Sequence, residues 1–140
     1  MAVRFGTPEW AKILEEEINA SSEYRNAAAS WGAGFNGNVL LVFEADDALS
    51  VARSLLVRLR EGSCQGVEFT PGVSHEDAGF VLRAPFGLWR EILERRTLAA
   101  TAIMTGRMRV EGDRMLLLRF LAAHRALIHC TSSVDTVFEA

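Results

Sequence analysis

The sequence contains few of the residues that define several classes of protein. Of its 140 residues, two are cysteine and three are proline, and the only lysine is Lys12. This composition excludes a cystine-stapled mini-protein, a collagen-like chain and a disordered chain. Cys64 and Cys130 have no near cysteine neighbours. We therefore expect two free thiols in a reducing compartment, with the cytoplasm as the location.

Basic clusters and uninterrupted apolar runs are also lacking. The net charge is −3 and the isoelectric point is near 5.6, so no global basic field attracts nucleic acid, and we expect no nucleic-acid partner. The first six residues contain no apolar signal region. The longest apolar stretch, residues 115–128, is interrupted by Arg119, His124 and Arg125, so it does not predict a bilayer span.

Hydrophobic residues, in contrast, are abundant. They make up 49% of the chain, and the mean hydropathy of +0.12 is high for a small domain. The length predicts a single domain, 1–140, that buries roughly two-thirds of its unfolded surface. The apolar surplus is greatest in a predicted helix over 114–130, where it exceeds the stripe of about 100° that a surface helix needs. Three explanations stay open: burial in the core, one wall of an apolar ligand cavity, or docking of a partner or second copy.

The motifs that suggest catalysis lack the structural context that catalysis requires. Residues 32–37 match G-x-G-x-x-G, but a helix precedes them and a strand follows, so we predict a turn. Residues 62–66 have the outline of a cysteine nucleophile elbow, but no helix follows, so we predict a hairpin loop with a half-buried thiol. His124 and His129 are five apart on a helix and do not converge on one metal, and His75 lies in a solvated loop. We predict no catalytic residue, metal or cofactor.

The hydrophobic periodicity predicts most of the regular elements. Helices are expected over about 8–20, after Ser21 or Ser22, over 86–95, from Thr97 to Gly106, and over 114–130; strands are expected at 39–43, 67–69, 80–83 and 107–111. Residues 48–60 are ambiguous. Apolar residues at i, i+3 and i+4 slightly favour a helix there, whereas alternation fits a strand over about 52–60.

The second half of the chain carries a recognisable order of motifs. A strand over 78–85 leads into a helix containing Trp89 and then a short helix; residues 106–113 follow as G-[KR]-h-[KR]-h-x-G-[DN], where h is apolar, before the last helix. This order resembles the sterol carrier protein type 2 family in its bacterial form. Trp10, Tyr24 before Trp31, and the Gly-Ser-Cys of residues 62–64 fit the same family order.

The resemblance implies a fold and a site. The fold class it implies is α+β, with a curved, mainly antiparallel five-stranded sheet, helices packed on one face, a hydrophobic tunnel, and a strand over 52–60. It implies no catalytic residues, and an intracellular, non-enzymatic protein that binds or transfers a fatty acid, acyl-CoA, phospholipid, sterol or isoprenoid. The Trp89 indole N–H could reach a headgroup. The candidate ligand-binding residues, each expected to face inward, are Phe80, Leu82, Trp89, Leu93, Met104, Met108, Val110, Leu118, Leu121, Ala122 and Ile128.

Two other functions remain open at the level of sequence. The first is an interaction or dimerisation domain that uses the apolar C-terminal helix. The second is a lipid-directed enzyme that uses Cys64 or His75. Transient membrane contact and a homodimer are likewise left open as partners.

Overall fold

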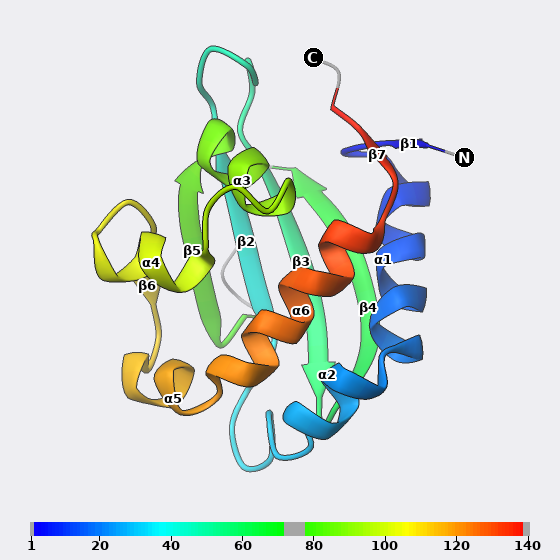
Figure 1. Cartoon of the computed structure of the whole chain (residues 1–140), viewed down its shortest axis with the longest axis vertical. Helices are drawn as coiled ribbons and strands as arrows, with labels where there is room; N and C mark the ends of the chain where they lie inside the picture. Colours follow the sequence, from blue (N-terminus) through cyan, green and yellow to red (C-terminus); the bar gives the residue numbers. More distant parts are fainter. Residues whose placement is uncertain (1, 72–77, 139–140) are drawn as a thin grey trace.

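The chain forms an α+β fold in the computed structural model, which describes residues 2–71 and 78–138 (Figure 1). The helices are α1 (Pro8–Ala20), α2 (Ser22–Ala27), α3 (Phe86–Leu93), α4 (Ala99–Met104), α5 (Arg114–Arg119) and α6 (Leu121–Ser133). The strands are β1 (Val3–Arg4), β2 (Val39–Glu44), β3 (Arg53–Arg60), β4 (Ser63–Pro71), β5 (Phe80–Pro85), β6 (Arg109–Glu111) and β7 (Thr136–Val137). No helix among the described residues is long and apolar enough to span a membrane.

Five strands form the main sheet, in the order β4-β3-β2-β5-β6. Every neighbouring pair is antiparallel except β2 and β5, which run parallel. In the centre of the sheet, Leu41 lies opposite Leu55 of β3 and Leu82 of β5. The short strands β1 and β7 pair separately, in parallel. The predicted fold class, with a mainly antiparallel five-stranded sheet, is confirmed.

The two faces of the sheet are covered differently. Helices α1, α3 and α6 lie over one face (Figure 1), and the main core forms between them and inward residues such as Leu55, Val57 and Phe80. The opposite face carries a separate, smaller cluster whose buried members are Leu40, Val42, Leu56 and Val81. Because side chains alternate along a strand, a central strand buried on both faces is apolar at nearly every position.

This double burial explains the ambiguous segment. Residues 53–60 form strand β3, as the family resemblance implied, and the helix that local periodicity favoured is wrong. Leu55 faces the helices while Leu56 faces the second cluster, so consecutive leucines produce an accidental helical spacing. Before the strand, the Asp46 carboxylate accepts hydrogen bonds from the backbone N–H groups of Ala48 and Leu49 and forms a local turn instead of a helix.

A tight turn joins β3 to β4. Glu61 and Gly62 both have positive φ, 49° and 84°, as a two-residue type I′ turn requires. A Cβ on Gly62 would lie 2.8 Å from the Arg25 carbonyl oxygen, so this position favours glycine for space as well. The hairpin is confirmed, but Cys64 lies within strand β4 and is buried rather than half-buried.

The predicted helix over 114–130 is two helices. The chain leaves helical geometry at Phe120, where φ is −108° and ψ is 33°, so α5 ends before α6 begins. Asp113 caps α5 by accepting a hydrogen bond from the Leu116 N–H. Helix α6 then buries a face at i, i+3, i+4, i+7 and i+8, made of Ala123, Ala126, Leu127, Cys130 and Thr131.

Candidate functional site

Three of the eleven predicted ligand-binding residues lie in the closed core. Phe80, Trp89 and Met108 are only 1–3% exposed. A void large enough for water would leave accessible surface on the side chains that line it, so the core is packed tightly around these three. The Trp89 indole N–H donates a hydrogen bond of 2.8 Å to the Val42 carbonyl oxygen. The prediction that this N–H group binds a ligand headgroup is therefore wrong, because the group already donates its hydrogen bond within the core.

Phe80 belongs to an aromatic cluster at one end of the sheet. Its ring centroid lies 4.9 Å from that of Trp31, which also contacts Phe120 at 5.2 Å and His124 at 4.8 Å. Burial lowers the pKa of His124 to about 4, so its imidazole is neutral at pH 7. The Trp31 indole N–H donates to the Gly37 carbonyl oxygen at 2.8 Å. This bond closes the glycine-rich turn, which confirms the turn interpretation of residues 32–37.

Four of the predicted residues are half-buried and pack against the main core. They come from four different elements, because Leu82 lies on β5, Leu93 on α3, Val110 on β6 and Ile128 on α6. Leu82 and Val110 are cross-strand partners, so their side chains share one face of the sheet. We refer to these four residues as the half-buried lining. A ligand can reach such side chains without dismantling the closed core.

The remaining four predicted residues point outward, so their expected inward orientation is wrong. Met104, the last residue of α4, is 81% exposed, and Leu118 and Leu121 are 48% and 39% exposed. Ala122 is also exposed. The break at Phe120 causes the difference in part, because it changes the phase of the helix so that α6 turns Ala123 and Ala126 toward the core instead. The sequence prediction assumed one continuous helix.

Three half-buried residues that the sequence reasoning missed lie on α4, on α5 and at the break between α5 and α6. Ile103 of α4, Leu116 of α5 and Phe120 are half-buried and pack against the main core. The four-residue spacing of Leu116 and Phe120 is a helical signal that could have identified them. These positions show that α4 and α5 contribute to the cover of the core.

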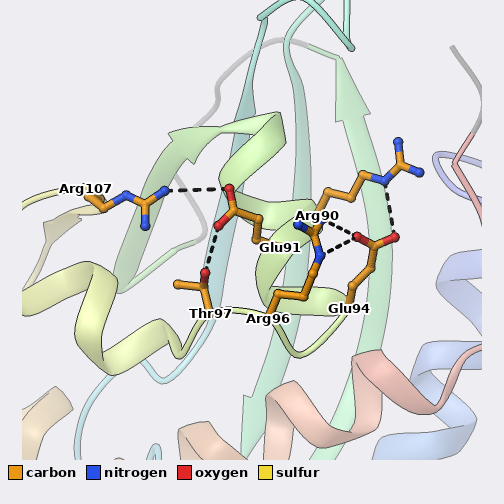
Figure 2. Close-up of polar contacts among 6 residues, drawn as sticks. All are labelled: Arg90, Glu91, Glu94, Arg96, Thr97 and Arg107. Atoms are coloured by element: carbon orange, nitrogen blue, oxygen red, sulfur yellow. Dashed lines mark hydrogen bonds and ion pairs between the residues drawn. The ribbon is translucent and has the colours of Figure 1, made fainter.

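A polar contact connects this cover to α3. Figure 2 shows the Glu91 carboxylate accepting a hydrogen bond of 2.8 Å from the Thr97 hydroxyl and pairing with Arg107 at 3.7 Å. Thr97 precedes α4 and Arg107 follows it. Glu91 therefore holds both ends of the α4 segment against α3. The helix predicted from Thr97 to Gly106 is shorter, because Leu98 occupies the cap position and α4 begins at Ala99.

Two hollows lie near β1, β7 and α3. One has a volume of about 230 Å³ and combines three arginines with aromatic rings, among them Phe5 and Phe138. The other has a volume of about 340 Å³, and it includes Leu93 but is mostly polar, with residues such as Glu94, Asp135 and Thr136. Ligand pockets usually measure about 300–1,000 Å³ and are mainly apolar. Neither hollow suits a long aliphatic chain.

The cysteine singled out as a nucleophile has the wrong environment for catalysis. Cys64 is 5% exposed, and burial raises the pKa of its thiol to about 11. The Asn19 side chain also fixes its backbone, since the amide donates to the Cys64 carbonyl at 2.9 Å and accepts from the Cys64 N–H at 2.8 Å. Reactive cysteines are thiolates at accessible sites, so Cys64 is structural. His75 lies outside the described residues.

The described residues contain no group of three or more His, Cys, Asp or Glu side chains arranged to hold a metal. His129 lies instead at the surface, 3.1 Å from the Glu23 carboxylate. Helices over one face of a mainly antiparallel sheet, with an apolar lining in place of an assembled polar centre, define a small α+β domain of the sterol-carrier type. The chain belongs to the SCP-2 sterol transfer family, whose family model matches residues 12–123.

Solved structures agree with this assignment. A crystal structure of sterol carrier protein 2 is 26% identical, with a TM-score of 0.84 over 94% of this chain and 99% of that chain. The conserved hypothetical protein TT1886 of Thermus thermophilus is 25% identical, with a TM-score of 0.83 over 98% and 94% of the two chains. A ubiquinone synthesis protein, UbiJ-SCP2, shares the fold at 14% identity, with a TM-score of 0.54 over 95% and 96%. A search of curated proteins gave no match.

Proposed function

We propose that the protein binds a lipid-like molecule and carries it without changing it chemically. Membership of the SCP-2 sterol transfer family and the likeness to sterol carrier protein 2 support this proposal. The observation that carries it is the half-buried lining, in which aliphatic side chains from four elements each pack against the closed core and stay partly accessible. The burial and raised pKa of Cys64 argue against the enzymatic alternative that uses this residue.

In this proposal the lipid chain lies over Leu82 and Val110, between α6 and the β5–β6 edge of the sheet. Leu93 and Ile128 contact it from the two sides. The α4 and α5 segments form its cover, and the contacts of Glu91 keep that cover closed. Because the core itself is packed, the ligand enters by displacing the cover rather than by filling an existing void.

The strength of binding follows from the size of the chain. Burying about fourteen methylene groups yields roughly 11 kcal/mol at about 0.8 kcal/mol each. Association costs of about 4–15 kcal/mol reduce this to micromolar or weaker affinity. Such affinity suits a carrier, which must release its cargo. The proposed ligands are fatty acids, acyl-CoA, phospholipids, sterols and isoprenoids, which all present an extended apolar body.

Two matched valines test the location of the site. Val110 and Val67 are both half-buried, both pack against the main core, and lie on the opposite edge strands β6 and β4. We expect Val110→Asp to weaken binding of a fluorescent fatty acid at least about tenfold, because a carboxylate then faces the apolar chain. Val67→Asp leaves the affinity unchanged. Equal losses in both variants, measured on folded protein, would place the ligand elsewhere.

A further inference from the structure

Positive charge is concentrated in one part of this acidic chain. Residues 95–125 contain seven arginines and only two acidic residues, Glu111 and Asp113, whereas the whole chain has a net charge of −3. The segment covers α4, β6, α5 and the beginning of α6. Figure 1 shows α4, β6 and α5 together beyond β5, on the side of the sheet away from α1.

The same segment carries most of the exposed apolar side chains. Six large hydrophobic residues are exposed within the described residues, and Val51 is the only one of them outside this segment. The other five are Leu98, Met104, Met115, Leu118 and Leu121. Met115 and Leu118 are three apart on α5 and thus share a face of that helix. Basic and apolar side chains therefore occur on the same elements.

Only part of the positive charge is neutralised by neighbours. Arg96 pairs with Glu94 and Arg107 with Glu91 (Figure 2), and Arg109 pairs with Glu44 at 2.8 Å. The two acidic residues of the segment are also occupied, because Glu111 pairs with Arg83 at 3.2 Å and Asp113 caps α5. Four exposed arginines form no ion pair within residues 2–71 and 78–138, namely Arg95, Arg114, Arg119 and Arg125.

We propose that these four arginines and five apolar residues, which we call the α4–α5 surface, dock the protein on a membrane containing anionic lipids. Guanidinium groups bind lipid phosphates, while leucine and methionine side chains enter the boundary between headgroups and acyl chains. A second copy related by a two-fold axis would bring like charges together. A single-stranded nucleic acid would call for exposed aromatic rings, and the exposed large side chains here are aliphatic.

The position of the α4–α5 surface also gives the lipid ligand a path between the membrane and the half-buried lining. This point rests on the proposed function. Ile103 and Leu116 pack against the core on the same two helices that carry Met104, Met115 and Leu118 outside. Docking therefore brings the cover of the half-buried lining into contact with the lipid. A ligand can pass from the membrane beneath the cover without crossing water.

Vesicle flotation tests the electrostatic part. The full chain is mixed with vesicles of phosphatidylcholine alone or with vesicles in which a third of the lipid is phosphatidylglycerol. We expect binding only to the anionic vesicles, and weaker binding at high salt. Each arginine near an anionic surface contributes roughly fivefold to partitioning, so the double variant Arg114→Glu/Arg119→Glu lowers binding at least about tenfold.

The control double variant is Lys12→Glu/Arg60→Glu. It produces the same change in net charge on exposed residues of α1 and β3, and we expect it to bind the anionic vesicles nearly as well as the wild type. Equal losses in the two double variants would overturn the proposal, because only the net charge would then matter. Binding that is independent of anionic lipid, or no binding at all, would overturn it as well.

A second pair of variants tests the apolar part. Met104→Ser removes an 81% exposed side chain from the α4–α5 surface, and Val51→Ser removes a 70% exposed one elsewhere. Only Met104→Ser should weaken flotation; equal effects would contradict the proposal. Fatty-acid binding is measured on the same samples without vesicles. A wild-type protein that binds fatty acid but does not dock on the anionic vesicles refutes this inference alone. A wild-type protein that docks but does not bind fatty acid refutes the proposed function alone.

Discussion

Replacing Trp89 with phenylalanine separates a structural role of this side chain from contact with a ligand. In the wild type, the indole N–H donates to the Val42 carbonyl oxygen at 2.8 Å, and both residues are 1% exposed. Phenylalanine retains an aromatic ring beside Phe43, whose centroid lies 5.2 Å away, but donates no hydrogen bond. A buried acceptor that loses its partner costs about 1–3 kcal/mol. The smaller ring also leaves a small cavity that adds to this cost.

We therefore expect Trp89→Phe to lower the free energy of unfolding by about 2 kcal/mol or more. For a chain of this length, that corresponds to a fall in Tm of roughly 6–10 °C. Urea denaturation followed by circular dichroism measures the first quantity and a thermal scan the second. Because the side chain lies in the closed core, the folded variant should bind a fluorescent fatty acid like the wild type.

The Val110→Asp variant provides the comparison for this experiment. It should lose ligand affinity, whereas Trp89→Phe should lose stability. The reasoning is refuted if Trp89→Phe retains its stability to within about 0.5 kcal/mol. It is also refuted if the folded variant binds fatty acid as weakly as Val110→Asp does, since Trp89 would then contact the ligand.

Two predictions follow from the shifted pKa values of buried groups. The Cys64 thiol, with its pKa raised to about 11, should resist iodoacetamide at about pH 8 until the chain unfolds; rapid alkylation of the native protein at this residue, located by peptide mass analysis, would contradict its burial. The pKa of His124 is lowered to about 4 from an ordinary 6.5, so the unfolded chain takes up the proton first as the pH falls. Stability that is present at pH 7 should fall by up to about 3 kcal/mol as the pH drops from 6.5 to 4. Urea denaturation of the wild type and His124→Gln should show a shallower loss in the variant, and identical slopes would exclude His124 as the cause.

Regular elements with clear end signals could be predicted from the sequence. The helix predicted over about 8–20 follows a threonine and begins with a proline, which together signal a helix start in the sequence. The side-chain cap is present in α1, since the Thr7 hydroxyl accepts a hydrogen bond from the Trp10 N–H. Strand β3 could not be assigned from periodicity alone, because burial on two faces weakens the alternation on which the assignment depends. The resemblance to the family, which implied a strand over 52–60, gave the assignment that the local pattern did not.

The candidate site was predictable in part, for a physical reason. Val110 lies between Arg109 and Glu111, and Leu82 lies two residues after Phe80, so the inward face of each strand followed from the period of two. The orientation of Leu118 and Leu121 could not be predicted, because the apolar run contains no sequence signal for the change of backbone geometry at Phe120. The predicted inward orientation of Met104 was wrong for another reason, since hydrophobicity alone does not distinguish a core residue from an exposed one.

The most direct test of the carrier function is native mass spectrometry of the purified protein, followed by solvent extraction and identification of any bound molecule. The account predicts a discrete added mass that corresponds to one lipid-like molecule, lost in the Val110→Asp variant and retained in Val67→Asp. A protein of bare mass that also fails to bind a fluorescent fatty acid at tens of micromolar would contradict the account, because the expected affinity lies near the micromolar range.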